Sequence, residues 1–346
     1  MARYRSGLYD KPRRRKRRWM RIILAFVVIG AVIASVYGYH PFRKGENEPA
    51  ATLTGANIID DAVDFAVLVP SGPEPEPPPE TTNYMPEDAS ESNPKVDEFI
   101  TEAAALIGTK PSRIIDAREK LNEALSMPMN EQQRASVKKK LSELADKWLF
   151  SRTVFEQDKL CGSYKVKPGD KLKAISKQFK VPYEILMKIN NINRPKALRA
   201  GETIKVINGP FCARIYRSAF TMDLYLQSTF VRSFSVALGR PGMETPTGLW
   251  VVKSDGKVIR PTWTDPITGK TYEAEDPDYP LGSRWIGLEG VAGSAKGRTG
   301  FAIHGTEDPE ELGTARSRGC IRLYDEDVKL VYDLLTPSLS EVVVVE

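Results

Sequence analysis

Hydrophobic residues are spaced differently in successive parts of the chain, and each pattern predicts a different structure. Residues 22–39 form a run of eighteen residues without a charge. Between residues 94 and 157, hydrophobic residues recur every three or four positions, which is typical of amphipathic helices. From residue 213 onward, they mostly alternate with polar residues, which is typical of strands. We therefore expect a multidomain chain with a mainly β domain at its C-terminal end.

The region 94–157 is predicted to be a helical hairpin, broken at Met127-Pro128. Asn130 and Gln133 have the spacing of a capping pair for the second helix. One helical pair cannot bury its own face, so we expect this region to support a neighbouring domain rather than form a peptide-binding repeat array. The expected buried faces consist of Phe99, Ala103, Leu106, Ile114, Ala117, Leu121, Leu125, Val137, Leu141, Leu144 and Trp148.

Residues 163–207 predict a small β-α-α-β domain. A strand at 164–166 leads through a Pro-Gly turn to Asp170, the expected N-cap of a first helix. Val181-Pro182 opens a second helix, and residues 203–207 form the closing strand. A polar loop rich in asparagine separates the second helix from this strand.

In the C-terminal domain, residues 249–252, 285–288 and 342–345 continue the strand pattern. One helix is expected to begin at Asp325, because three successive acidic residues suit the positive end of a helix dipole. The segment 261–279 is polar and rich in turn-forming residues. With Trp263 and two tyrosines, it is predicted to form a flap or the lip of a cleft rather than core.

Charge is concentrated at the N-terminal end. The whole chain carries +5, but its first 21 residues hold ten Lys/Arg against one acid, so the remainder carries −4. That remainder offers no basic surface for nucleic acid. The basic segment 1–21 before an apolar run instead predicts a cytoplasmic tail and a transmembrane helix at 22–39, with the rest of the chain outside. A cleaved signal peptide and twin-arginine export are the alternatives.

Residues 40–93 are predicted to be a linker, because proline and glutamate dominate its second half. Such a spacer lets a tethered domain reach a target at some distance from the membrane. Cys161 and Cys212 flank the small domain just outside its terminal strands. If those strands pair antiparallel, the two thiols emerge side by side, so we predict a disulfide, consistent with an oxidising compartment.

Cys320 is then the cysteine left for chemistry. A thiol becomes a strong nucleophile as a thiolate, and a nearby imidazole is a common means of activating it. The chain has two histidines, and His40 adjoins the apolar run, so His304 is the candidate partner. Gly305 and Gly319 would let the backbone approach a substrate closely. Backbone N–H groups around Gly319 and Cys320 would face a developing oxyanion.

The string around these residues, His-Gly-Thr at 304–306 and Ser-Arg-Gly-Cys-Ile-Arg at 317–322, resembles the signature of the L,D-transpeptidase (YkuD-like) family. The resemblance covers residues 213–346, with further matching residues at 245–248 and 280–285. It implies a β-sandwich or barrel, with Cys320 as nucleophile, His304 as base, Gly305 orienting the imidazole through its carbonyl, and Ser317 shaping the loop. One departure is Arg318, where many members carry histidine.

The resemblance also implies the reaction. Cys320 would attack a peptidoglycan stem tetrapeptide, release D-alanine and pass the acyl group to an amine, giving a 3→3 cross-link or protein anchoring. Transfer to water would make the protein an L,D-carboxypeptidase, and an inert domain would leave a peptidoglycan-binding protein. We expect Arg322 and Arg318 to lower the thiol pKa and attract a substrate carboxylate. Neither a cofactor nor a metal is expected.

The segment 163–207 is similar to the LysM family along its length. This implies binding of peptidoglycan or chitin glycans, with contacts from Gly169, Asp170 and Leu172 on one loop and Asn191 on the other. The expected partners are therefore stem peptides, glycan strands and the membrane. The expected location is the bacterial inner membrane, single-pass, with both domains facing the periplasm or cell wall. The oligomeric state is left open.

Overall fold

The computed structural model describes residues 91–346. The predicted cytoplasmic tail, the transmembrane helix and nearly all of the linker lie outside this range. Within residues 91–346, no helix is both long and apolar enough to cross a membrane.

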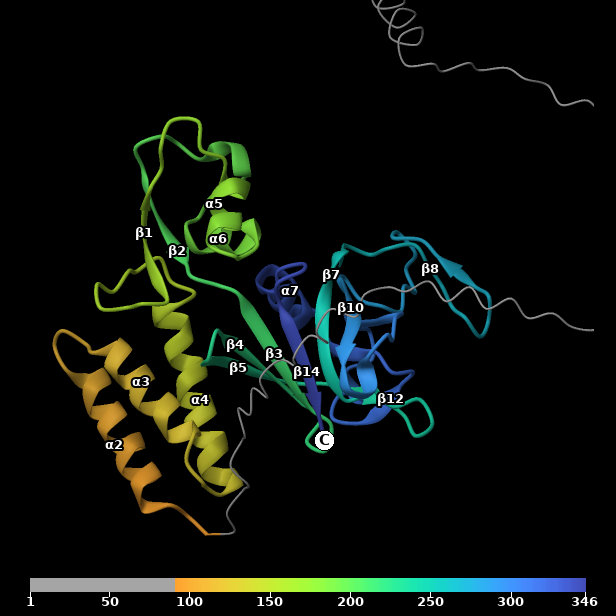
Figure 1. The fold of residues 1–346 in the computed structure, drawn as a ribbon, viewed down its shortest axis with the longest axis horizontal. Helices are drawn as coiled ribbons and strands as arrows, with labels where there is room; N and C mark the ends of the chain where they lie inside the picture. Colours follow the sequence, from red (N-terminus) through yellow and green to blue (C-terminus); the bar gives the residue numbers. More distant parts are fainter. Residues whose placement is uncertain (1–90) are drawn as a thin grey trace, which may run out of the picture. The chain divides into compact units, whose positions relative to one another are not determined.

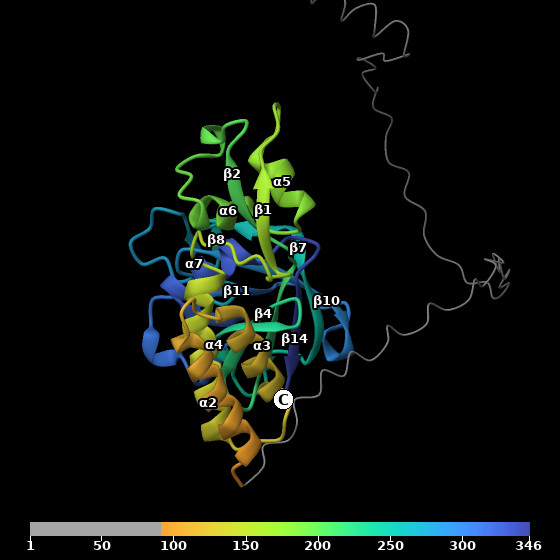
Figure 2. The ribbon, with the colours of Figure 1, turned by 90° about the vertical axis from the view of Figure 1, so that its left-hand side faces the viewer.

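The first region contains three helices, so the predicted hairpin is wrong by one element. They are α2 (Pro94–Gly108), α3 (Ile114–Leu125) and α4 (Glu131–Trp148) (Figures 1 and 2). The break between α2 and α3 falls at Gly108 and before Pro111, which cannot continue a helix. Asn130 caps α4 as expected, accepting the Gln133 N–H at 2.9 Å. The Gln133 amide binds the Asn93 backbone, which joins the starts of α2 and α4.

The small domain has the predicted order of elements. These are β1 (Cys161–Lys165), α5 (Leu172–Gln178), α6 (Tyr183–Ile189), the 3-10 turn η1 (Pro195–Ala197) and β2 (Thr203–Ile207), with β1 and β2 antiparallel. The predicted cap is wrong. Lys171 occupies the N-cap of α5, and the Asp170 carboxylate instead accepts from the Lys167 N–H and the Tyr164 hydroxyl. Asn190 is buried and holds β2 through both backbone groups of Lys205.

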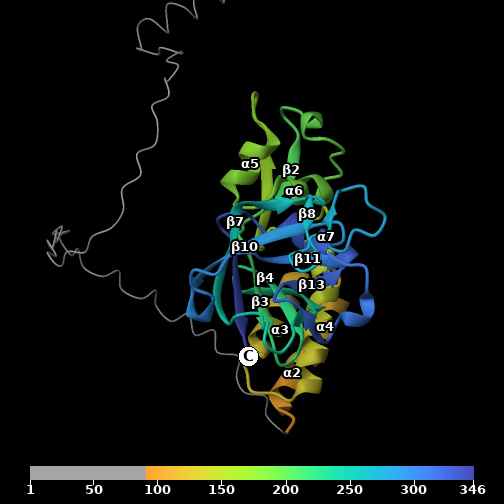
Figure 3. The same ribbon diagram turned by 90° about the vertical axis from the view of Figure 1, so that its right-hand side faces the viewer.

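The C-terminal domain is built on an eight-stranded sheet of order β13-β11-β10-β7-β14-β3-β4-β5. Figure 3 shows β7, β10, β11 and β13 in succession. The strands are β3 (Phe211–Tyr216), β4 (Thr221–Leu226), β5 (Thr229–Ser235), β7 (Gly248–Val258), β10 (Trp285–Ala292), β11 (Phe301–Thr306), β13 (Ile321–Tyr324) and β14 (Glu341–Val345).

The edges of this sheet approach each other after β5. Ala237 and Arg322 exchange two backbone hydrogen bonds of 3.0 and 2.9 Å, so the chain beyond β5 pairs with β13. Short strands β6 (Leu238–Gly239) and β12 (Ala315–Ser317) add a further parallel pair. The domain is therefore mainly β and barrel-like. Helix α7 (Asp325–Leu334) begins where the acidic cluster predicts it and contacts β11 and β13.

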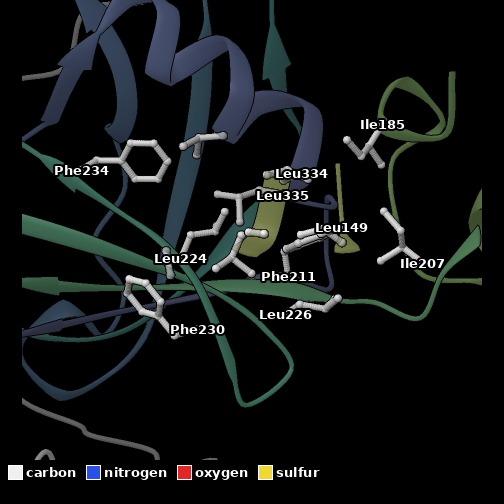
Figure 4. Packing of buried hydrophobic residues seen from close by; sticks show 14 of the residues in the cluster. Leu149, Ile185, Ile207, Phe211, Leu224, Leu226, Phe230, Phe234, Leu334 and Leu335 are labelled. Carbon is white, nitrogen blue, oxygen red and sulfur yellow. The ribbon is translucent and has the colours of Figure 1, made fainter. Parts of the chain in front are cut away.

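One hydrophobic core runs through all three described regions. Figure 4 shows Leu149 after α4, Ile185 from α6, and Phe211 and Leu335 from the sheet domain among its members. The Lys205 ammonium extends this junction. It donates to the carbonyls of Trp148, Ser151 and Thr153 at the end of α4. The helices thus support both neighbouring domains, as the sequence predicts.

The predicted disulfide is absent, and all three cysteines are free. β2 ends at Ile207, and the chain then enters the large sheet, where Cys212 lies opposite Tyr225. Cys161 instead lies near Asp158 and Arg118 of the helical region. The two thiols therefore emerge in different surroundings rather than side by side. Burial raises the pKa of Cys161 to about 12 and that of Cys212 to about 11.

Candidate active site

Two adjacent parallel strands bring the proposed nucleophile and base to one cleft. In β11 and β13, Ile303 lies opposite Ile321 and His304 lies opposite Arg322. Cys320 immediately precedes β13, which places it about two positions from His304 along the strand direction. Both residues line a cleft of about 410 Å³. The cleft thus brings together the cysteine and the histidine that the sequence singles out.

The His304 imidazole is buried and held on two sides. Its Nδ1 lies 2.7 Å from the Gly305 carbonyl oxygen, and because that oxygen can only accept, Nδ1 carries the proton. The Nε2 lone pair is then available as a base. Trp285 lies opposite in β10, with its ring stacked on the imidazole at 5.6 Å between centroids. Burial, with a smaller contribution from Arg322, lowers the pKa of His304 to about 4, although hydrogen bonds to the Gly305 and Leu281 backbone act in the opposite direction.

The Cys320 thiol is protonated at neutral pH. Burial raises its pKa above the ordinary value, although the Ala302 backbone N–H and Arg322 act in the opposite direction. The expectation of a lowered thiol pKa is therefore wrong, because desolvation outweighs the nearby charge. With His304 neutral as well, the pair is a thiol beside a neutral imidazole.

The loop that carries Cys320 is fixed by two buried hydroxyls. Ser317 Oγ accepts the Gly319 N–H at 3.1 Å and donates to the Cys320 carbonyl at 2.6 Å. Thr245 Oγ donates to the Gly319 carbonyl at 2.9 Å and accepts the Gly239 N–H at 3.1 Å. Ser317 thus links the backbone groups of Gly319 and Cys320. Because the Gly319 N–H already donates to Ser317, only the Cys320 N–H of these two backbone groups remains as a candidate oxyanion donor.

The two glycines are required by internal packing rather than by close approach of a substrate. Gly319 has φ +110°, and a Cβ there would meet the Phe301 ring at 2.7 Å. A Cβ on Gly305 would meet the Asp325 carboxylate at 2.8 Å. The same carboxylate accepts the Ser283 N–H at 2.6 Å, so the start of α7 holds the chain around His304.

Each predicted arginine already has an acidic partner. Arg322 pairs with Glu311, and Arg318 pairs with Asp265, with Nη1 to Oδ1 at 2.8 Å. Asp265 follows β8 (Trp263–Thr264), which pairs with β9 (Thr271–Tyr272) in a hairpin. This hairpin forms one wall of the cleft, as predicted for the segment 261–279. Tyr279 is the exception, because it is fully buried.

Comparison with known families decides the identity of both globular regions. Residues 213–344 match the YkuD L,D-transpeptidase catalytic domain, and residues 164–206 match the LysM domain. The chain carries a LysM domain followed by an L,D-transpeptidase catalytic domain. These ranges lie close to the boundaries expected from the sequence, 163–207 and 213–346.

Several proteins named as L,D-transpeptidases resemble the chain. YkuD of Bacillus licheniformis is 27% identical over 172 residues, which cover 48% of this chain and 88% of that protein. YqjB of Bacillus subtilis is 37% identical over 99 residues, covering 28% of this chain and 49% of that protein. A crystal structure of an L,D-transpeptidase from Mycobacterium tuberculosis H37Rv is 16% identical, with a TM-score of 0.32. That alignment covers 42% of this chain and 65% of the other.

In the LysM domain, the four predicted glycan-binding residues differ in exposure. Gly169 and Asn191 lie on turns with positive φ and are exposed, and Asp170 is half-buried. Leu172 is buried in the core, so its side chain is not available to a glycan.

Sequence reasoning missed three residues of the L,D-transpeptidase site: Thr245, Asp265 and Asp325. Thr245 belongs to a stretch that carries the family resemblance, and this was the only signal for its role. Asp265 and Asp325 lie in acidic, turn-rich or helix-starting sequence, where many carboxylates are merely solvated.

Proposed function

We propose that this L,D-transpeptidase acts through Cys320 as nucleophile and His304 as general base. The substrate is a peptidoglycan stem tetrapeptide, cleaved between the diamino acid at position 3 and the D-alanine at position 4. The main support is one observation. A neutral imidazole, with its Nδ1 proton held by a carbonyl, shares a cleft with a cysteine on a rigid loop.

The protonation states define the first step. His304 Nε2 accepts the thiol proton as the Cys320 sulfur attacks the carbonyl carbon, so charge develops only during the attack. In this proposal, the Cys320 N–H stabilises the carbonyl oxygen as it becomes negative. The imidazolium then returns its proton to the leaving nitrogen, and D-alanine departs from the acyl-thioester.

The second step repeats the chemistry with an acceptor. His304 removes a proton from an incoming amine, which attacks the thioester, and the Cys320 thiol is restored. An amine of a second stem gives a 3→3 cross-link, and an amine of a protein gives anchoring. We propose that the LysM domain binds glycan strands and raises the local concentration of stems. We also propose that the N-terminal apolar segment 22–39 anchors the protein to the inner membrane.

The test is intact-mass analysis after incubation with a carbapenem, followed by incubation with purified tetrapeptide muropeptides. We expect a covalent adduct on Cys320 and loss of D-alanine with formation of dimers. Cys320→Ala should abolish both, with Cys212→Ala as the matched control that retains them. Shortened monomers without dimers would indicate an L,D-carboxypeptidase. A wild-type protein that forms neither adduct nor product would refute the catalytic proposal.

A further inference from the structure

The β8–β9 hairpin is shaped by its own side chains. Trp263 and Tyr272 stack with ring centroids 5.9 Å apart. Lys270 pairs with Asp278 at 2.6 Å, and Tyr279 donates to the Pro261 carbonyl at 2.6 Å. All of these contacts lie within the segment 261–279. They fix the form of the hairpin but not its position against Cys320.

One polar link joins this hairpin to the nucleophile loop. Within residues 91–346, β8 and β9 pair only with each other. Two side chains outside the segment 261–279 donate hydrogen bonds to it: its chain neighbour Arg260, and Arg318. Arg318 Nη1 and Nη2 donate to the two Asp265 carboxylate oxygens at 2.8 and 3.5 Å.

Both ends of the link are anchored. Asp265 also accepts the Ile267 N–H at 2.8 Å. The hydrogen bonds from Arg318 and Ile267 together lower the pKa of the Asp265 carboxyl to about 2. Arg318 stands between Ser317, which is fully buried, and Gly319. Ser317 donates to the Cys320 carbonyl, and the Gly319 carbonyl accepts from Thr245. Among residues 91–346, this guanidinium–carboxylate pair is therefore the hydrogen-bonded side-chain link between the hairpin and the loop.

We propose that Arg318 is a positioning residue that, through Asp265, holds the β8–β9 hairpin closed over Cys320. The effect of this contact on catalysis rests on the proposed function. A closed wall limits the entry of water to the thioester, which favours an amine bound in the cleft over hydrolysis. The pairing also means that Arg318 serves the cleft wall rather than a substrate carboxylate.

The first test measures access to the thiol and does not depend on the proposed reaction. We would follow iodoacetamide labelling of Cys320 by peptide mass mapping, in wild type and in the Asp265→Asn and Arg318→Met variants. An opened hairpin should raise the limiting labelling rate at high pH by up to about fivefold, the upper end expected for loss of one partly exposed pair. Lys270→Met is the matched control, because it removes an ion pair within the same hairpin and should leave the rate unchanged.

Measuring the rates from pH 6 to 11 separates access from electrostatics. Loss of a charge shifts the midpoint of the titration, whereas an opened wall raises the rate of the fully ionised thiol. Equal limiting rates in wild type and both link variants would overturn the proposal. So would an equal rise in Lys270→Met. Thermal unfolding of each variant checks that the domain remains folded. The double variant Asp265→Arg with Arg318→Asp should bring the rate back toward wild type.

The second test measures the partition of the acyl-enzyme. With tetrapeptide donor and a fixed amine concentration, Asp265→Asn should raise the ratio of hydrolysis to transfer several-fold, and Lys270→Met should not. If wild type forms no acyl-enzyme, the proposed function fails, while the labelling comparison still decides whether Arg318 holds the hairpin.

Discussion

The neutral state of the Cys320–His304 pair predicts how acylation depends on pH. The His304 pKa of about 4 lies well below the ordinary value of 6.5. At pH 5, an imidazole with pKa 4 is about 90% neutral, whereas one with pKa 6.5 is only about 3% neutral. The fraction of protein with a competent base therefore differs by roughly thirtyfold between the two cases.

The assay is the rate constant for acylation by a carbapenem, followed by stopped-flow absorbance from pH 3.5 to 9. We expect a rate that is nearly constant between pH 5.5 and 8 and falls with an acid limb near pH 4. Iodoacetamide labelling, which needs a preformed thiolate, should instead continue to rise toward high pH, because burial raises the pKa of Cys320. Comparing the two reactions separates base-assisted attack from a resting ion pair.

Two results would refute this reasoning. An acid limb near pH 6.5 would show that His304 is not desolvated as the fold implies. Rapid iodoacetamide labelling that is already maximal at pH 6 would show a thiolate–imidazolium pair in the resting enzyme.

Three further predictions concern stability and the loop. Because the folded pKa of His304 is depressed, the unfolded chain binds its proton first as pH falls, so stability is full above pH 6.5 and declines toward pH 4. The decline should be about 3 kcal/mol larger in wild type than in His304→Gln by urea unfolding. Thr245→Val leaves the buried Gly319 carbonyl without its donor, and should lower stability by roughly 1–3 kcal/mol and slow carbapenem acylation, whereas Thr247→Val should do neither. Lys205→Met leaves three carbonyls at the end of α4 unpaired, and should cost about 2–4 kcal/mol in guanidinium unfolding without changing the acid limb of acylation.

Much of the architecture follows from local pattern in the sequence. Alternation predicted the strands, the acidic cluster predicted the start of α7, and Asn130 predicted the cap of α4, because each signal lies within a few residues of the element it specifies. The Cys320–His304 pair was recognisable because its neighbours form a family signature. Failures arose where a long-range partner takes over a local role. Asp170 could cap α5, but its carboxylate is claimed by Tyr164 and Lys167.

The charges in the cleft show the same limit. Arg318 and Arg322 stand beside the nucleophile in sequence, and from that position alone a lowered thiol pKa was a reasonable prediction. Their carboxylate partners, Asp265 and Glu311, come from other parts of the chain. Pairing with a carboxylate offsets part of the field that each arginine places on the sulfur. Burial of the sulfur outweighs both the remaining effect of Arg322 and the Ala302 hydrogen bond, so the pKa of Cys320 rises. Only the folded chain decides which effect is larger.

Helix α7 gives the LysM domain a structural route to the proposed catalytic residues. At its start, Asp325 holds Ser283 and packs against Gly305, next to His304. Near its end, Asp333 pairs with Lys188 of α6 at 3.0 Å, on a partly exposed surface where such a pair contributes little to stability. The helix therefore has a rigid attachment at the catalytic end and a weak polar one at the LysM end. Because the core is continuous across both domains, we expect their relative position to depend on buried contacts such as Lys205 with α4, and hardly at all on the Lys188–Asp333 pair.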